Sequence, residues 1–191
     1  MTTRVLAFAG SVRRDSWNVR LIKIAAEQAR AAGAELTLLD LAKYPLPIFD
    51  EDSESSQGLH PNALALKDLF KAHHALLIAC PEYNSSITPL LKNTIDWISR
   101  PRQGERPLEC FSGKVCALLA ASPGALGGLR GLVHVRAILG NIGVIVLPDQ
   151  LALPKAHEAF KPEGTLADPA QTERIAALAK SLVRAATRLM S

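Results

Sequence analysis

The stretch "VLAFAGSVRRDSWN", residues 5–18, joins an apolar run to a polar turn. Residues 5–9 are apolar without alternation, which is typical of a parallel strand that is buried on both faces. The serines, arginines and asparagine of residues 10–18 then precede a segment with helical periodicity, residues 18–32. A buried strand that enters a helix through a short polar turn predicts an α/β fold.

The same alternation of apolar runs and helical segments continues along the chain. We predict strands at residues 5–9, 36–39, 75–79, 115–120 and 144–147. We predict helices at residues 18–32, 61–71, 90–98, 129–142 and 169–190, and a loop at residues 44–57. Strands that alternate with helices require right-handed crossovers, so we expect a three-layer, doubly wound, five-stranded parallel sheet.

The composition of the chain limits the classes of protein to which it can belong. The 191 residues are 48% hydrophobic, which suits one domain, residues 1–191, with a single buried core. No apolar stretch is long enough to span a bilayer and no secretory leader precedes the first strand, so we expect a soluble cytoplasmic protein without a membrane partner. The net charge is +4, but the basic residues are dispersed and aromatic residues make up only 5%. This pattern argues against nucleic-acid binding and suits small polyanionic ligands.

The cysteines are Cys80, Cys110 and Cys116, and they form no C-x-x-C pair. Two of them lie in or next to apolar runs. We therefore interpret the cysteines as small buried hydrophobic residues of a reducing compartment and assign them no metal.

Ligands of doubly wound sheets bind beyond the carboxyl ends of the strands, so the loops after Ala9, Ala79 and Ala121 are the candidate site. In the first loop, Ser16 is a candidate N-cap of the following helix, and Ser11, Arg13 and Asn18 would surround the helix N-terminus. These groups suit a terminal phosphate. Neither a P-loop nor a G-x-G-x-x-G motif is present. Alternatively, the serines are ordinary turn and cap residues and the arginines are solvated.

The second loop lies within "CPEYNSSITPLLKNTIDW", residues 80–97. Thr88 and Pro89 form an N-cap and first-turn pair, which places the start of the next helix. Before them, Tyr83 offers a flat aromatic face and Asn84 an amide, groups that suit the edge of a planar heterocycle. The alternative is an exposed polar turn with Tyr83 packed over its rim.

The third loop, "ASPGALGGLRG" at residues 121–131, has four glycines between Gly124 and Gly131. Glycine at this density indicates close backbone approach or positive φ angles. A ligand ring or a partner backbone would explain this requirement, and a mobile glycine-rich loop is the alternative.

Together the three segments resemble one family. The patterns are G-S-x-R-x-x-S-x-N, P-E-Y-N-x-S-x-x-P-x-L-K-N-x-I-D-W and S-P-G-x-x-G-G-x-R. In this order and spacing, from residue 3 to about residue 150, they are similar to the NAD(P)H-dependent FMN reductases, which include chromate and quinone reductases. The resemblance implies a flavodoxin-like fold with strand order 2-1-3-4-5. One departure is the sequence Ile87-Thr88-Pro89, since the family commonly has its proline earlier.

The resemblance also implies which residues hold FMN. The phosphate would be held by the side chains of Ser11, Arg13, Ser16 and Asn18 with the backbone of Trp17 and Val19 nearby. The ring and ribityl chain would be lined by Pro81, Glu82, Tyr83 and Asn84. The pyrimidine side of the ring would lie along Ser122, Gly124 and Gly127.

The activity implied is hydride transfer from NADPH or NADH to flavin N5, followed by reduction of a small-molecule acceptor in a ping-pong cycle. Quinones, free flavins, azo dyes and chromate-type oxyanions are the candidate acceptors. No side chain is required as a nucleophile, and we expect Tyr83 to position the ring. The alternatives are an electron carrier of the flavodoxin type or an FMN-binding redox regulator without turnover. The net charge of +4 and Arg13 favour the reductase over the carrier, since flavodoxins are strongly acidic.

The family also implies a homodimer, or a tetramer built from two such dimers. The segment with Trp97, Ile98, Arg100 and Arg102, and beyond it Leu108 and Phe111, is a candidate interface. The edge of the chain's own core with a solvated rim is the alternative for this segment.

Overall fold

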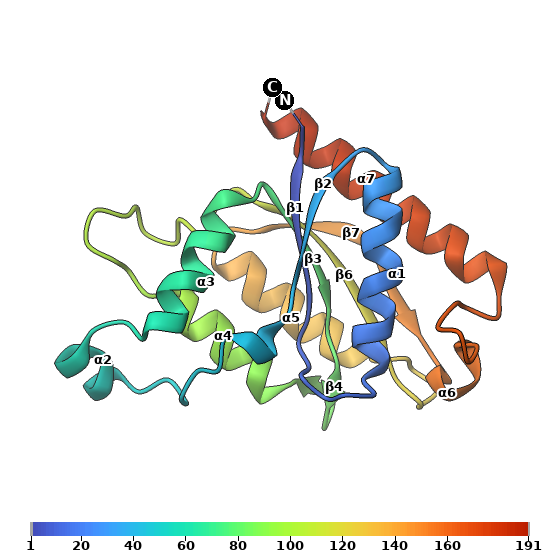
Figure 1. The fold of residues 1–191 in the computed structure, drawn as a ribbon, viewed down its shortest axis with the longest axis horizontal. Coiled ribbons are helices and arrows are strands. Elements are labelled where there is room, and N and C mark those ends of the chain that lie inside the picture. Colours follow the sequence, from blue (N-terminus) through green and yellow to red (C-terminus); the bar gives the residue numbers. More distant parts are fainter. Residues whose placement is uncertain (1, 191) are drawn as a thin grey trace.

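The computed structural model describes residues 2–190, and one parallel sheet forms its centre (Figure 1). Its strands are β1 (Arg4–Ala9), β2 (Glu35–Leu39), β3 (Ala75–Ala79), β6 (Val115–Ala121) and β7 (Ile145–Leu153). Across the sheet they lie in the order β2-β1-β3-β6-β7, and each neighbouring pair is parallel. In chain order this is 2-1-3-4-5, so the predicted doubly wound, flavodoxin-like sheet is confirmed.

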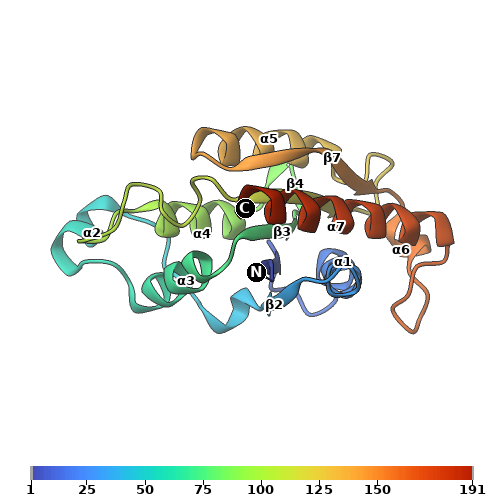
Figure 2. The same cartoon turned by 90° about the horizontal axis from the view of Figure 1, so that it is seen from above.

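Helices cover both faces of the sheet. One face packs against α1 (Trp17–Ala31) and α7 (Pro169–Met190), which lie side by side in Figure 2. The other face packs against α3 (Pro61–Ala72), α4 (Pro89–Ser99) and α5 (Leu129–Asn141). The shorter elements are η1 (Leu41–Lys43), α2 (Glu51–Gln57), α6 (Ala156–Ala159) and a hairpin of β4 (Glu82–Tyr83) and β5 (Ser86–Ile87).

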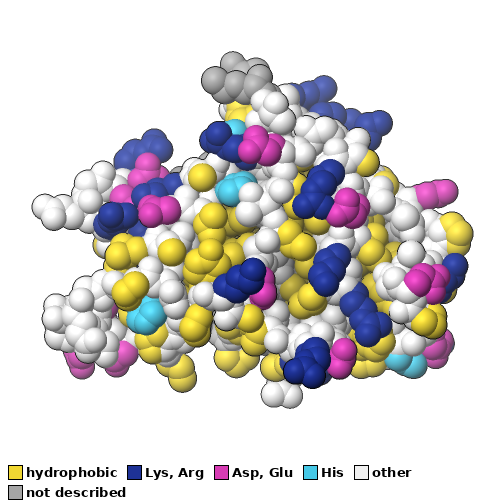
Figure 3. Space-filling model, in the orientation of Figure 1, with side chains coloured by type: hydrophobic (Ala, Val, Ile, Leu, Met, Phe, Trp, Pro, Cys, Tyr) yellow, Lys and Arg dark blue, Asp and Glu magenta, His cyan; other side chains and the backbone are white. Residues whose placement is uncertain are grey.

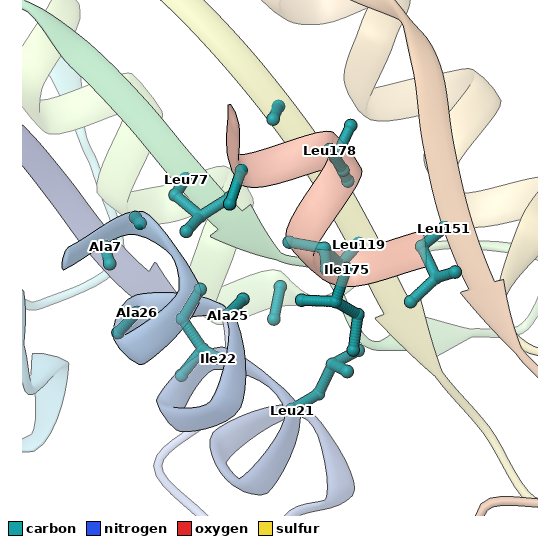
Figure 4. Packing of buried hydrophobic residues seen from close by; sticks show 14 of the residues in the cluster. Ala7, Leu21, Ile22, Ala25, Ala26, Leu77, Leu119, Leu151, Ile175 and Leu178 are labelled. Atoms are coloured by element: carbon teal, nitrogen blue, oxygen red, sulfur yellow. The ribbon is translucent and has the colours of Figure 1, made fainter. Parts of the chain in front are cut away.

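The apolar run of β1 lacks alternation because both of its faces are buried. Val5 and Ala7 belong to the core under α1 and α7, whereas Leu6 and Phe8 belong to the core under α3, α4 and α5. Figure 4 shows Ala25 and other α1 residues packed toward the strands. Small alanine side chains on α1 let the helix approach the sheet closely, and this fixes the start of α1 over the end of β1.

Two predicted helix starts are confirmed by their caps. The N–H of Val19 donates to the Ser16 hydroxyl at the start of α1, and the N–H of Leu91 donates to the Thr88 hydroxyl at the start of α4. Gly33, with φ of +92°, follows the end of α1 as predicted. Both helix starts therefore lie at the carboxyl edge of the sheet, at the lower edge in Figure 1.

The prediction of a loop throughout residues 44–57 was wrong, because α2 occupies residues 51–57. The Asp50 carboxylate caps this helix by accepting from the N–H of Ser53 at 2.7 Å. Acidic side chains in the first turn, such as Glu51 and Asp52, further favour the helix dipole. The acidic composition indicated an exposed segment, but the capping signal within it was missed.

The last strand is longer than the predicted residues 144–147, since β7 continues to Leu153. Pro148 cannot donate a backbone hydrogen bond, and the ladder to β6 shifts register between Cys116 and Leu118 opposite this part of the strand. The Arg136 guanidinium donates to the carbonyl of Leu147 at 2.7 Å. This contact from α5 stabilises β7 next to the proline, so that the strand continues toward the site.

The proposed interface segment contributes its apolar side chains to the chain's own core. Trp97, Ile98 and Phe111 are each no more than 2% exposed. Arg102 is exposed, and Arg100 pairs with Glu54 at 2.8 Å. The segment therefore has the structure of a core edge with a charged rim.

All three cysteines are buried and carry free thiols, as predicted. Desolvation raises the pKa of each thiol, so these groups stay protonated and behave as small apolar residues. Among residues 2–190, no helix has the length and apolarity needed to cross a bilayer.

A buried ion pair attaches the loop after α4 to α3. The Lys67 ammonium lies 2.9 Å from a Glu105 carboxylate oxygen, and the Lys71 ammonium lies 2.6 Å from the other. Burial has the largest single effect on Glu105 and opposes its ionisation, but the hydrogen bonds and charges of Lys71 and Lys67 together outweigh it and lower the pKa below its ordinary value. Lys67 also donates to the Arg100 carbonyl at 2.6 Å, so the pair holds the end of α4.

We expect Glu105→Gln to lower the free energy of unfolding by about 3 kcal/mol at pH 7, because it leaves the buried Lys67 charge without its counter-charge. Because folding lowers the pKa of Glu105, its stabilisation is complete above the unfolded carboxyl pKa and is lost as pH falls through the folded one. Urea unfolding across pH measures both effects. Glu173→Gln on α7 is the exposed control. Equal unfolding free energies for the wild type and Glu105→Gln at pH 7 would contradict the assignment.

Candidate functional site

The three polar loops meet in one pocket at the carboxyl edge of the sheet. Its lining residues come from the ends of β1, β3 and β6 and from the start of α1. They are Ser11, Arg13, Ser16, Trp17, Asn18, Pro81, Glu82, Tyr83, Ala121, Ser122 and Pro123. Residues more than a hundred positions apart in the chain thus form one surface, as expected at the switch point between β1 and β3.

Gly10 lets the first loop pack directly on the second. Its N–H donates to the Ala79 carbonyl at 2.9 Å, continuing the ladder between β1 and β3. A Cβ at this position would lie 3.0 Å from the Leu91 Cβ and 3.3 Å from Pro81 Cδ. The Thr88 hydroxyl donates to the Gly10 carbonyl at 2.7 Å while it caps α4. The unusual Ile87-Thr88-Pro89 sequence therefore joins the two loops.

The start of α1 presents hydrogen-bond donors to the pocket. Ser16 accepts only the N–H of Val19, at 3.4 Å, and backbone N–H groups of a first helical turn have no partner within the helix. The Ser11 hydroxyl accepts from the N–H of Arg13 at 3.3 Å and keeps its own proton free to donate. Arg13 is exposed and reaches back to the Asp15 carbonyl at 3.3 Å. Hydroxyl, amide and guanidinium donors with a positive helix end suit an anion.

Asn18 joins the first loop to the third. Its side-chain amide donates to the Ala121 carbonyl at 2.8 Å, and its side-chain oxygen accepts from the Ala121 N–H at 3.0 Å. The residue is 4% exposed. One amide hydrogen is left for a ligand, so positioning of the two loops is the larger part of what Asn18 does.

The second loop forms a short antiparallel hairpin. Asn84 and Ser85 have φ angles of 49° and 65°, which is the conformation of a type I′ turn between β4 and β5. Tyr83 is 48% exposed at the pocket. The turn chemistry of Asn84 was not recognised in the sequence, where this residue was expected to contact a ligand.

Glu82 connects the hairpin to α5. One carboxylate oxygen accepts from the N–H of Gly131 at 2.9 Å, and the other pairs with Arg130 at 3.2 Å. Its side chain is 10% exposed. The protein therefore holds the Glu82 carboxylate in place. Because both of its oxygens already have partners, the group is not available as a free acid or base.

Gly127 and Gly128 of the third loop are explained by contacts with the chain itself. Gly127 has φ of +61°, and a Cβ there would lie 2.6 Å from the Leu153 carbonyl carbon. Gly128 has φ of +93°, and its Cβ would lie 2.6 Å from the Ala120 Cβ. These close approaches bring the loop against the end of β7. A ligand is not needed to account for them.

Four predicted residues do not line this pocket. Val19 lines an adjoining pocket, Asn84 lies in the hairpin turn, and Gly124 and Gly127 belong to the third loop. Ser122 does line the pocket, and its hydroxyl accepts from the N–H of Gly124 at 3.2 Å. The prediction omitted Ala121 and Pro123, although both flank Ser122 in the sequence.

Trp17 is held by a residue that no local pattern connects to it. Its ring stacks on Phe160, with 5.5 Å between ring centroids and 18° between planes. The Arg20 guanidinium lies over the Trp17 ring, 4.8 Å from its centroid. The stack fixes the indole beside the pocket and joins the segment after α6 to the start of α1.

The family profile of NADPH-dependent FMN reductases matches residues 3–158, a span that contains all three loops. The chain belongs to this family.

Individual relatives agree with that membership. The sequence is 35% identical over 173 residues to the NAD(P)H-dependent FMN reductase of Pseudomonas aeruginosa, covering 90% of this chain and 89% of the relative. It is 32% identical to probable NADPH:quinone oxidoreductase 2 of Oryza sativa, covering 97% of this chain and 90% of the relative. In structure it is similar to FerB, a flavoenzyme NAD(P)H:(acceptor) oxidoreductase of Paracoccus denitrificans, with a TM-score of 0.82, 27% identity and 98% of each chain covered.

As a member of this family, the chain is an enzyme, an NAD(P)H-dependent oxidoreductase that uses FMN and a nicotinamide donor. An archaeal flavodoxin has a TM-score of 0.63 at 8% identity, which shows that the two proteins share their fold.

We expect Asn18→Ala to lower the free energy of unfolding of this reductase by about 2 to 6 kcal/mol. The substitution leaves a buried N–H and a buried carbonyl of Ala121 without partners, at about 1 to 3 kcal/mol for each group. Urea unfolding measures the change, and Asn141→Ala at the exposed end of α5 is the matched control. An unfolding midpoint equal to that of the control would show that the loops hold their spacing without Asn18.

Proposed function

We propose that the pocket of the three loops binds FMN and that the enzyme passes electrons from NADPH or NADH to small-molecule acceptors. Quinones, free flavins, azo dyes and chromate-type oxyanions are the acceptors proposed. The observation that carries the proposal is the convergence of all three family motifs on one pocket, which is lined by both the N-terminus of α1 and Tyr83. The family match supplies the cofactor class.

The phosphate end of FMN fits the donors at the start of α1. Ser11 and Ser16 provide hydroxyls, Arg13 provides a guanidinium, and the backbone of Trp17 provides an N–H in the first turn. A phosphate dianion is stabilised by this combination of charge-assisted hydrogen bonds and helix dipole. Arg13 is exposed and makes only a 3.3 Å hydrogen bond to the Asp15 carbonyl, so little is lost when it turns to a phosphate.

The ring end fits the hairpin and the third loop. Tyr83 offers an exposed aromatic face, and Pro81 and Ser122 line the pocket beside it. When bound, FMN would supply the redox chemistry, which is hydride acceptance from the donor and electron delivery to the acceptor. The chain's residues bind and orient the reactants. Glu82, the carboxylate of the pocket, is engaged by Gly131 and Arg130 and is a positioning residue.

Arg13→Ala should weaken FMN binding by about 1.5 to 3 kcal/mol, because it removes a charge-assisted hydrogen bond to the phosphate. Titration of the apoprotein with FMN, followed by flavin fluorescence, measures the change. Riboflavin, which has no phosphate, should bind both proteins equally. Arg184→Ala on the exposed face of α7 controls for the loss of one positive charge. Equal FMN affinity of Arg13→Ala and the wild type would contradict the phosphate assignment.

We further propose that donor and acceptor use the same open side of the pocket in turn. The exposure of Tyr83 supports this arrangement, since the pocket is open beside the hairpin. Initial rates measured at several quinone concentrations should then give parallel lines in double-reciprocal plots against NADPH. Intersecting lines would mean that both substrates bind together. FMN binding without any turnover would favour a carrier or redox regulator instead.

A cytoplasmic homodimer is proposed as the working form. Support comes from apolar side chains that remain exposed near the hairpin, where Leu129 and Val133 of α5 are 41% and 57% exposed. A second copy is a suitable cover for such a surface. Sedimentation analysis of the FMN-loaded protein should give the mass of two or four chains, and a monomer with full activity would overturn this part of the proposal.

A further inference from the structure

The helices on the two sides of the sheet differ in charge. Together α1 and α7 carry seven Lys and Arg residues against two Glu residues, a net charge of +5. By contrast, α2, α3, α4 and α5 carry five basic and five acidic residues, so their net charge is zero. Since the whole chain carries +4, all residues outside α1 and α7 together are close to neutral. The basic residues are dispersed in the sequence, and the fold brings them to one side.

The basic side chains of α1 and α7 lie opposite the core. On each helix the buried residues form one stripe against the sheet, and the Lys and Arg residues lie on the other side of the helix. The two helices lie side by side (Figure 2), and Figure 3 shows Lys and Arg side chains grouped along α1. We refer to this surface as the basic face, and it consists of Arg20, Lys23, Arg30, Arg174, Lys180, Arg184 and Arg188.

Several of these charges have no counter-charge in the protein. Lys23, Lys180 and Arg184 are exposed, and their side chains form no ion pair and no hydrogen bond with any residue from 2 to 190. Arg30 pairs with Glu27 of the same helix. Exposed cations without counter-charges attract anions to a protein surface. The basic face is therefore open to an anionic partner.

A broad anionic surface fits the basic face better than a small anion or a nucleic acid does. The 22 residues of α7 span about 33 Å, so no small ligand reaches all of these charges. Trp17 is the aromatic residue of the two helices, and its ring is already in contact with Phe160 and Arg20. The face thus lacks an aromatic platform for bases. Anionic lipid headgroups attract separated Lys and Arg residues through charge alone.

The basic face begins at the proposed FMN pocket. Trp17, the first residue of α1, lines that pocket, and the Arg20 guanidinium lies over its ring. The proposed dimer surface with Leu129 and Val133 belongs to α5, across the sheet, and leaves the basic face uncovered. A membrane surface held against α1 and α7 therefore reaches the edge of the pocket.

We propose that the basic face binds anionic lipid headgroups and brings the pocket to quinones dissolved in a membrane. The part that concerns quinones rests on the proposed function, whereas lipid binding requires no turnover. Binding to a membrane surface needs no spanning helix, and none is present among residues 2–190. Our expectation of a protein without a membrane partner considered only spanning segments and a leader. Because the attraction is electrostatic, it is reversible and is weakened by salt.

The first test is sedimentation of the protein with unilamellar vesicles of phosphatidylglycerol and phosphatidylcholine. Binding is expected at low salt, and it should be lost in concentrated salt and with phosphatidylcholine alone. A variant with Lys23→Ala, Lys180→Ala and Arg184→Ala should lower the partition coefficient about a hundredfold, because it removes three unpaired charges from the surface. Its unfolding midpoint in urea should equal that of the wild type, since these side chains have no partner to lose.

A matched control removes the same charge from exposed positions outside the basic face. Its substitutions are Lys43→Ala, Arg106→Ala and Lys161→Ala. The control should bind the anionic vesicles as the wild type does. The proposal would be overturned by a wild type that binds no vesicles at low salt, or by equal binding of all three proteins. Binding of duplex DNA without binding of vesicles would also overturn it, and would assign the face to a nucleic acid.

The second test compares a long-chain quinone held in the anionic vesicles with a water-soluble quinone, each reduced with NADPH or NADH. The variant with Lys23→Ala, Lys180→Ala and Arg184→Ala should raise the KM for the membrane-held quinone about tenfold or more. Its KM for the soluble quinone and its FMN affinity should stay unchanged. An equal change for both quinones, or a change for neither, would overturn the role in quinone delivery. If the wild type reduces neither quinone, the proposed function fails, and the vesicle experiment alone decides lipid binding.

Discussion

The two hydrogen bonds between the Asn18 amide and the Ala121 backbone set the spacing on which the site depends. They join the start of α1 to the end of β6 across β3, and they are buried, at 2.8 and 3.0 Å. Water cannot replace them, so the first and third loops keep one separation. The Thr88 hydroxyl does the same for the first and second loops by donating to the Gly10 carbonyl. The pocket is thus preorganised by bonds within the protein.

Polar residues of the family motifs divide into those that build the pocket and those that face it. Asn18 and Glu82 are held by backbone and arginine partners within the protein. Arg13 and Tyr83 are exposed toward the opening. A sequence pattern contains both kinds without distinction, which is why a motif residue is not by itself a ligand contact. The two kinds of residue can be told apart only from their hydrogen-bond partners in the structure.

Elements specified by neighbouring residues were predictable from the sequence. The apolar runs defined the sheet, and the Ser16 and Thr88 caps defined the helix starts at the site. Features that depend on distant residues were not. β7 passes Pro148 because Arg136 of α5 supports it, and Trp17 is fixed by Phe160. The glycines at 127 and 128 signalled close approach correctly, but only the fold shows that they approach β7 and Ala120.

The central claim is that the three loops hold FMN where a nicotinamide donor can reduce it. Its most direct test is the visible absorption of the protein, loaded with FMN and freed of excess, when NADPH or NADH is added without oxygen. The account predicts retained flavin whose oxidised absorption is lost at once and returns when a quinone is added. Flavin that stays oxidised with both donors, or a protein that retains no FMN, would contradict it.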